Sequence, residues 1–210
     1  MEKSEFAIAK VEPGKLNALV KSIMRQTGAD PNESVRLVNS GEWVVTRAVR
    51  AFKVFMTLNL GTGVKDADGF REALKKARCG IEEWADDIIG KRGLRVASEK
   101  TEVKLVAVSV AELGFAMGAT RADIFRRANQ IGLALCSREV GPQMRLQYKN
   151  QPSGECLTIG MEPITDSEGN SAIYDIRCSE FFDGWLQLGA MVGDSDYFWS
   201  SVTRWVFIKA

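Results

Sequence analysis

The stretch "GECLTIGMEPITDSEGNSAIYDIRC", residues 154–178, decides the predicted fold class, because two alternating segments flank one polar turn. Every second residue is apolar in both segments: Leu157, Ile159 and Met161, then Tyr174, Ile176 and Cys178. This period of two is typical of a strand with one buried face. The "DSEGN" between them has the composition of a turn. The stretch therefore predicts a β-hairpin with its loop near residues 167–170.

The register follows from placing both apolar sets on one face, which pairs Met161 with Ile176. The same register sets Glu162 opposite Asp175, with Arg177 diagonal to Glu162. Two facing acids are unfavourable without a cation, and Arg177 can supply the cation. We predict an ion cluster on the outer face, with a metal site as the alternative. An EF-hand is excluded, because the glycine of "DSEGN" falls at the fourth loop position and Arg177 at the twelfth.

The chain before this hairpin shows helical periodicity. Apolar residues recur at three- and four-residue steps in five segments, 15–28, 31–41, 67–80, 81–91 and 121–135. Asp30 before Pro31, and Thr120 with Asp123 three residues on, have the chemistry of N-caps. Residues 137–146 predict a further short helix that Gly141 and Pro142 interrupt.

Alternating or β-branched segments predict strands outside the hairpin. They lie near 50–60, with another at 43–47, at 103–110, and within 184–192 and 203–210. The expected class is α+β: a helix-rich N-terminal half with a short sheet, and a C-terminal half with an antiparallel sheet packed on one or two helices. The linker-like "GLRVASEKTE" divides the chain into a mainly helical region, 1–97, and an α+β region, 98–210.

Composition restricts the chemistry. The 210 residues contain no histidine, which removes Ser-His-Asp, Cys-His and imidazole acid–base mechanisms and most transition-metal hydrolases. The four cysteines form no C-x-x-C pair, so we do not expect a structural zinc site. We expect the cysteines to be buried, reduced thiols. The start of the chain lacks an apolar signal region, and no apolar run reaches transmembrane length. We therefore predict a cytoplasmic protein without a cofactor or membrane contact.

The net charge of +1 conceals an asymmetry. Residues 100–149 carry eight bases against four acids, whereas residues 150–200 carry one base against nine acids. Either the two segments neutralise each other in the fold, or the surface has a basic and an acidic face.

Two groups of polar residues are the predicted binding residues. The first is a basic cluster with one aromatic ring: Arg121, Arg126, Arg127, Arg145, Tyr148 and Lys149. It either pairs with the acids downstream or contacts phosphates. The second group is the hairpin cluster of Glu162, Asp175 and Arg177. We predict no catalytic residue and no metal ligand.

Two further features leave alternatives open. The carboxylates of Glu82, Glu83, Asp86 and Asp87 form either a solvated helix face or a cation site. The aromatic residues near the C-terminus either build the core or, where Tyr197, Phe198 and Trp199 are exposed in their loop, form a binding platform.

Several stretches together resemble a family of uncharacterised bacterial proteins. They include "LVNSGEWVV", "WADDIIGK", "EVGPQMRLQY" and "MEPITDSEGN", and the resemblance extends over most of the chain from about Ser34 onward. Ser137 stands where a proline is expected, and Glu168 where an aspartate is. The resemblance implies a bacterial setting and no activity, cofactor or catalytic residue.

The sequence favours a non-enzymatic binding or regulatory protein that acts through protein contacts, including occlusion of a partner's surface. One alternative is a nucleic-acid-binding module that uses the basic segment 120–149. Another is a magnesium-dependent hydrolase or nuclease that uses the carboxylates of Glu155, Glu162, Asp166 and Asp175.

Overall fold

The computed structural model describes residues 52–91, 94–180 and 184–209, together with a few positions between 14 and 36. The chain divides into two compact units, Met1–Ala48 and Val49–Ala210. In the first unit the predicted cap at Asp30 is confirmed, because its Oδ1 accepts hydrogen bonds from the backbone N–H groups of Asn32 (2.8 Å) and Glu33 (3.1 Å). The predicted strand at 43–47, and most of the helices predicted at 15–28 and 31–41, lie outside the described residues.

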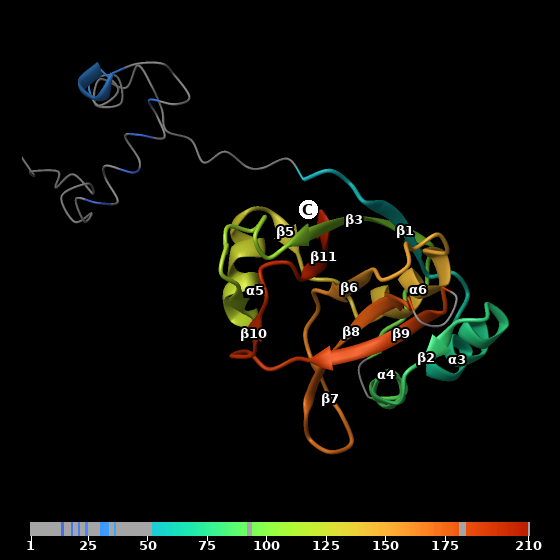
Figure 1. The fold of residues 1–210 in the computed structure, drawn as a ribbon. Helices are drawn as coiled ribbons and strands as arrows, with labels where there is room; N and C mark the ends of the chain where they lie inside the picture. Colours follow the sequence, from blue (N-terminus) through green and yellow to red (C-terminus); the bar gives the residue numbers. More distant parts are fainter. Residues whose placement is uncertain are drawn as a thin grey trace, which may run out of the picture. The chain divides into compact units, whose positions relative to one another are not determined.

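One curled, mixed sheet forms the frame of the second unit (Figure 1). Among the described residues it has nine strands. Their order is β1 (Met56–Leu60), β3 (Thr101–Ser109), β11 (Arg204–Lys209), β6 (Cys156–Ile159), β8 (Ser171–Cys178), β9 (Leu186–Val192) and β2 (Gly80–Ile81). Two short strands join at the sides, β5 (Leu133–Ala134) on β11 and β7 (Ile164–Thr165) on β8. A separate two-stranded sheet pairs β4 (Ala119–Thr120) with β10 (Phe198–Trp199).

This arrangement contradicts the predicted fold class. The N-terminal half is not a helix-rich region with its own sheet, because β1 pairs with β3 and β2 pairs with β9. Regions 1–97 and 98–210 therefore both contribute strands to one sheet. The C-terminal sheet is also not purely antiparallel, since β11 runs parallel to β6, with Trp205 beside Thr158. The sequence does not predict β2, because a strand of two residues is too short to show a periodicity.

The four helices of this described part are short. They are α3 (Ala67–Lys76), α4 (Glu83–Ile89), α5 (Arg121–Gln130) and α6 (Val140–Gln147). The predicted inward faces of three are confirmed by buried side chains: Phe70 and Leu74 on α3, Ala85, Ile88 and Ile89 on α4, and Ile124 and Ala128 on α5. The cap at Thr120 is also confirmed, since its Oγ1 accepts a hydrogen bond from the Asp123 N–H at 3.2 Å. No helix among these residues is long and apolar enough to cross a membrane.

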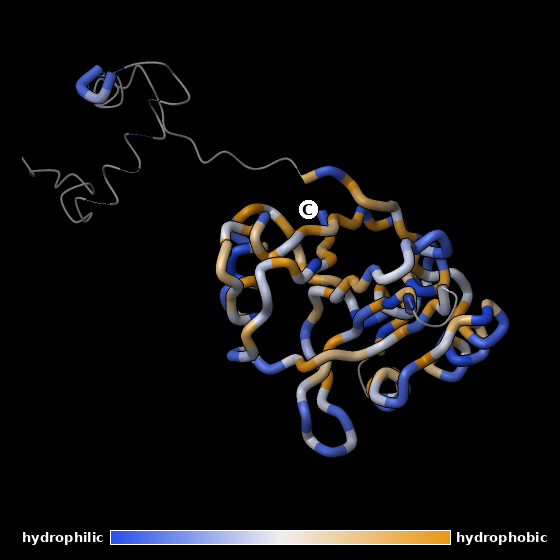
Figure 2. The backbone as a smooth tube through the Cα atoms, viewed as in Figure 1, coloured by the Kyte–Doolittle hydropathy of each residue, from blue (hydrophilic) through white to orange (hydrophobic). Residues whose placement is uncertain are grey.

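The predicted hairpin exists, but its register differs from the prediction. β7 pairs with β8 through Thr165 and Ser171, whereas β6 pairs with β8 through Leu157 and Ile176. Between these ladders the chain leaves β8, and the Gly160 N–H bonds the Val206 carbonyl of β11 at 2.9 Å. In Figure 2 the turn between β7 and β8 is coloured as largely hydrophilic, in contrast to the more hydrophobic strands.

The predicted pairings of Met161 with Ile176 and of Glu162 with Asp175 are therefore wrong. Asp175 lies opposite Thr158 instead. A strict period-two register assumes an unbroken strand, and the break at 160–163 shifts every residue that precedes it.

Helix α6 lies inside the curl of the sheet. It contacts β1 at one end of the strand order and β8 and β9 towards the other end, so the sheet must curl around it. Six of its eight residues are buried. Pro142 does not interrupt this helix, because it stands in the first turn, where its missing N–H has no helical acceptor.

A ladder of polar side chains four residues apart runs along α6. Glu139, Gln143 and Gln147 bond in sequence, the Gln143 amide donating to Glu139 (2.9 Å) and the Gln147 amide to Gln143 (3.1 Å). Glu139 also accepts from the N–H groups of Gly61 (3.0 Å) and Ala97 (2.8 Å). We call these three residues the polar ladder.

The last rung of the polar ladder holds the edge strand β1. The Gln147 side chain accepts from the Asn59 N–H at 3.0 Å and donates to the Asn59 carbonyl at 2.7 Å. The Gln147 amide thus satisfies both backbone groups of Asn59, which would otherwise lack these partners.

Gly141 gives a direct test of how closely α6 fits the sheet. A Cβ at this position would lie 2.7 Å from the Tyr174 ring of β8. Helix propensity alone predicts that Gly141→Ala stabilises the protein by about 1 kcal/mol. We expect the opposite, a loss of about 1–3 kcal/mol in the free energy of unfolding, because buried overpacking outweighs propensity. Urea titration measures the difference.

The control is the same substitution in a Tyr174→Leu background, where the ring is gone. There Gly141→Ala should cost clearly less, so the double variant loses less stability than the sum of the two single variants. An additive pair, or a stabilising Gly141→Ala in the parent, would show that α6 is not seated against β8 as described.

Candidate functional site

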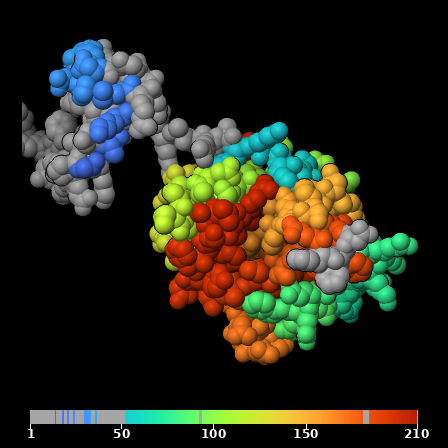
Figure 3. Space-filling view, in the orientation of Figure 1, coloured from blue at the N-terminus to red at the C-terminus, as the bar shows by residue number. Residues whose placement is uncertain are grey.

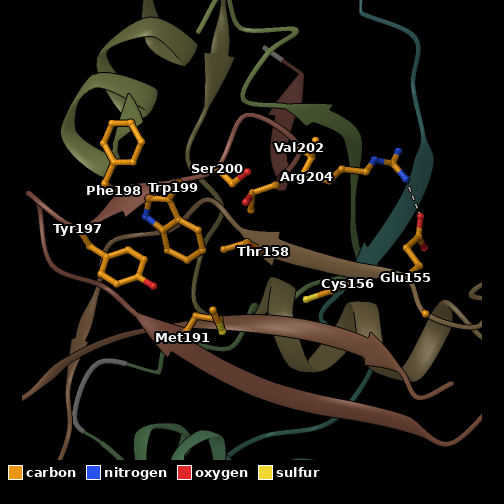
Figure 4. A pocket seen from close by; sticks show the side chains of 12 residues that line it. Glu155, Cys156, Thr158, Met191, Tyr197, Phe198, Trp199, Ser200, Val202 and Arg204 are labelled. Atoms are coloured by element: carbon orange, nitrogen blue, oxygen red, sulfur yellow. Dashed lines mark hydrogen bonds and ion pairs between the residues drawn. The ribbon is translucent and has the colours of Figure 1, made fainter. Parts of the chain in front are cut away.

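A groove of 570 Å³ opens beside the strands β6 and β9 and the short strand β10 (Figure 4). Its floor is formed by Cys156, Thr158 and Met191. Its rim carries the aromatic loop that ends in β10, together with Val202. At the far end lies an ion pair between Arg204 and Glu155. We call this the aromatic groove.

Beside the groove β6 and β11 pair over only two residues each. At the N-terminal ends of both strands, Arg204 Nη1 forms an ion pair with Glu155 Oε1 at 2.6 Å. The Tyr148 hydroxyl also donates to Glu155 at 3.0 Å. Burial, reinforced by this carboxylate, raises the pKa of Tyr148 to about 12, so the phenol stays a donor at neutral pH.

The rim combines buried and exposed aromatic side chains. Trp199 is buried, with its ring edge-on to Trp205 at 4.7 Å, whereas Phe198 is 60% exposed and Tyr197 is 41% exposed. Phe198 packs on Gly118, where a Cβ would lie 2.6 Å from the ring. The exposure that the platform alternative requires is thus present at Tyr197 and Phe198, whereas Trp199 belongs to the core.

Beneath the floor lies a carboxylate that the fold buries completely. Asp175 Oδ2 is 2.8 Å from Arg177 Nε and 3.4 Å from Cys156 Sγ. Burial raises the pKa of Asp175, although Arg177 opposes this shift. Arg177 also reaches Glu82 Oε2 at 3.3 Å, so a residue from the start of α4 supplies the second acid of this cluster.

Cys156 is not an activated nucleophile in this arrangement. The residue is exposed at the surface, but its sulfur lies against the Asp175 carboxylate. Partial burial of the thiol, together with that carboxylate, raises its pKa to about 12. The thiol is therefore protonated at neutral pH, whereas thiol nucleophiles need the thiolate. The other three cysteines, Cys79, Cys136 and Cys178, are buried, as the sequence predicts.

The basic cluster predicted from residues 120–149 is divided between two places. Arg121, Arg126 and Arg127 lie on α5, which Figure 1 shows well apart from α6 and the residues that follow it. Arg126 pairs with Asp123 at 2.6 Å, and Arg127 donates to the Leu113 carbonyl at 2.9 Å. The Arg121 guanidinium lies 4.9 Å from the centre of the Phe125 ring.

Arg145 is fully buried, and its hydrogen bonds hold together parts of the fold. Its guanidinium donates to the Gln151 side chain at 2.5 Å and to the backbone carbonyls of Tyr148 and Arg177. Lys149, in contrast, is exposed, and its Nζ lies 3.3 Å from Cys79 Sγ. Of these two predicted basic residues, only Lys149 therefore offers a charge to the surface.

The predicted hairpin cluster is brought together in part. Asp175 and Arg177 form an ion pair, but Glu162 is exposed and does not face them. The carboxylates considered for a magnesium enzyme have separate partners: Glu155 pairs with Arg204, and Asp166 accepts from Trp84 and Asn170. Within the described residues, no three His, Cys, Asp or Glu side chains are grouped to hold a metal ion.

The hairpin turn and α4 border a second, acidic depression of 940 Å³. Six carboxylates line it: Glu82, Glu83, Asp87, Asp166, Glu168 and Asp194. Asp87 fixes the turn, since its two oxygens accept from the Ser167 hydroxyl and N–H, both at 2.6 Å, and one lies 2.9 Å from Lys91 Nζ. These bonds lower its pKa to about 2.

Comparison with known proteins gives no relative. No family model matches the chain, and neither a curated protein nor a solved structure matches it. The resemblance to uncharacterised bacterial proteins thus rests on the sequence motifs alone.

Asp87 predicts a pH dependence of stability. Its carboxylate has a lower pKa in the folded protein than the ordinary 3.8, so it stabilises the fold above about pH 4 and loses that effect as the pH falls through about 2. We expect Asp87→Asn to lower the urea midpoint at pH 6 and to flatten its decline between about pH 4 and 2. Asp194→Asn, a change in the same depression, is the control. Parallel acid declines in the parent and Asp87→Asn would contradict this role.

Proposed function

We propose that the protein is a non-enzymatic binding module that holds a peptide segment of a partner protein in the aromatic groove. One observation carries this proposal. Of the five large apolar side chains that are exposed among the described residues, three line this groove: Tyr197, Phe198 and Val202, which is 78% exposed. Apolar residues exposed together in one place are typical of protein interfaces, where aromatic rings contribute most of the affinity.

The rim is held in place before any partner arrives. Tyr197 lies edge-on to the buried Trp199 ring at 5.1 Å, and Phe198 rests on the backbone of Gly118. Figure 3 shows the C-terminal residues, in red, covering a large part of this face of the molecule. Rings that are already ordered lose little conformational entropy on binding, which favours affinity.

The chemistry of the groove suits a segment with an apolar anchor and a polar end. Met191 and the protonated thiol of Cys156 give a soft, uncharged floor near the rings. At the other end the Arg204 side chain is 41% exposed while it pairs with Glu155. Its remaining N–H groups are positioned to donate to a backbone carbonyl or carboxylate of the segment.

A random peptide library displayed on phage tests the proposal, because it samples many segments at once and requires no chosen partner. We expect the parent to enrich peptides with at least one aromatic or large aliphatic residue. The double variant Phe198→Ser, Val202→Ser should lose this enrichment. Both residues are exposed, so the fold should remain, which the unfolding midpoint of the variant checks.

Trp185→Leu is the matched control, because Trp185 is a large exposed apolar residue that does not line the groove. It should enrich the same peptides as the parent. The proposal fails if the parent enriches no sequence class, or if the groove variant selects the same peptides as the parent.

A further inference from the structure

A third open depression, of 650 Å³, lies at the C-terminal end of α3 and beside β2. Figure 1 places α3 and β2 on the opposite side of the view from β10, so this surface is separate from the aromatic groove. Its lining includes one indole, Trp185, the basic side chains of Arg71, Lys75 and Arg78, and the carboxylate of Asp86. We call it the basic–indole surface.

Arg78 stands at the most unusual backbone position of this surface. Its φ of 55° is the one positive value for a non-glycine residue in the described part of the chain. It follows the last turn of α3, where the Arg78 N–H bonds the Lys75 carbonyl (3.0 Å) and the Cys79 N–H bonds the Leu74 carbonyl (2.9 Å). Helix ends of this kind normally carry glycine. A strained arginine where glycine would fit indicates that its side chain has a use.

Trp185 offers a stacking face. Its side chain rests on the backbone of Gly80, where a Cβ would lie 2.5 Å from the indole Nε1. The residue is nevertheless 46% exposed. The indole is thus supported from below by the start of β2 and open to solvent elsewhere, which is the arrangement that proteins use to stack unpaired bases.

Three cations in or beside this depression have no ion pair with any described residue. Lys75 and Arg78 are exposed and line the depression, and Lys149 Nζ reaches Cys79, which lines it as well. Arg71 differs, because Asp86 (2.6 Å) and Asp68 (2.8 Å) take up its charge. The surface therefore keeps an unbalanced positive charge in a chain whose net charge is only +1.

We propose that the basic–indole surface binds single-stranded nucleic acid, with a base stacked on Trp185 and phosphates on Arg78, Lys75 and Lys149. Stacking requires an unpaired base, which distinguishes a single strand from a duplex. The flat indole favours a nucleic acid over an acidic peptide, because an acidic peptide would need only the cations. This activity does not depend on the aromatic groove, because the two surfaces share no residue.

Fluorescence anisotropy of a labelled oligothymidylate of about twelve nucleotides tests the proposal, at about 50 and 200 mM salt. We expect binding that weakens with salt. Trp185→Leu should weaken it about 10-fold, the order expected for one lost base–indole stack. Arg78→Gly should also weaken it while the unfolding midpoint stays equal or rises, because glycine relieves the left-handed backbone. This variant separates lost binding from lost folding.

Two controls complete the experiment. Lys104→Gln removes one exposed charge from β3, outside this surface, and Phe198→Ser alters the aromatic groove; both should bind like the parent. The proposal is overturned if the parent does not bind at the lower salt, or if Lys104→Gln weakens binding as much as Trp185→Leu. It is equally overturned if duplex DNA or polyglutamate competes as well as the unlabelled single strand.

Discussion

The fold depends on the polar ladder of α6. A helix inside a curled sheet brings buried polar groups with it, and each of these must find a partner or destabilise the protein. Glu139 and Gln147 meet this requirement with backbone groups from distant parts of the chain, namely Gly61, Ala97 and Asn59. Gln143 bonds the Thr62 hydroxyl and its two neighbours in the ladder. The same bonds hold the edge strand β1 and two loops against the helix. The conspicuous polar pattern of "EVGPQMRLQY" is thus explained largely by architecture.

Helix α6 also covers one face of the sheet at β8. Tyr174 of β8 packs on Gly141 of α6, so its neighbour Asp175 points to the opposite face. Thr158, the cross-strand partner of Asp175, lies on that same outer face and lines the aromatic groove. The inner face therefore packs on α6, and the outer face carries the Asp175–Arg177 ion pair and borders the exposed rings that we propose for a partner.

Local signals in the sequence predict helix caps and buried helix faces correctly. They do not predict the strand pairing and register, which depend on contacts between distant residues. The caps at Asp30 and Thr120 and the apolar faces of α3, α4 and α5 follow from spacing alone. The parallel pairing of β11 with β6 and the break at 160–163 depend on contacts with residues far along the chain. For the same reason Arg145, basic in the sequence, is buried against carbonyl groups, whereas Arg78 gave no signal because left-handed backbone is invisible in composition.

Amide hydrogen exchange, measured residue by residue by NMR, tests the role of the polar ladder most directly. We expect the Asn59, Gly61 and Ala97 amides to be protected in the parent, since each donates to a side chain of the ladder. Gln147→Ala should accelerate exchange mainly at Asn59, and Glu139→Ala mainly at Gly61 and Ala97. Rapid exchange of all three amides in the parent, or an equal acceleration of all three by either variant, would contradict it.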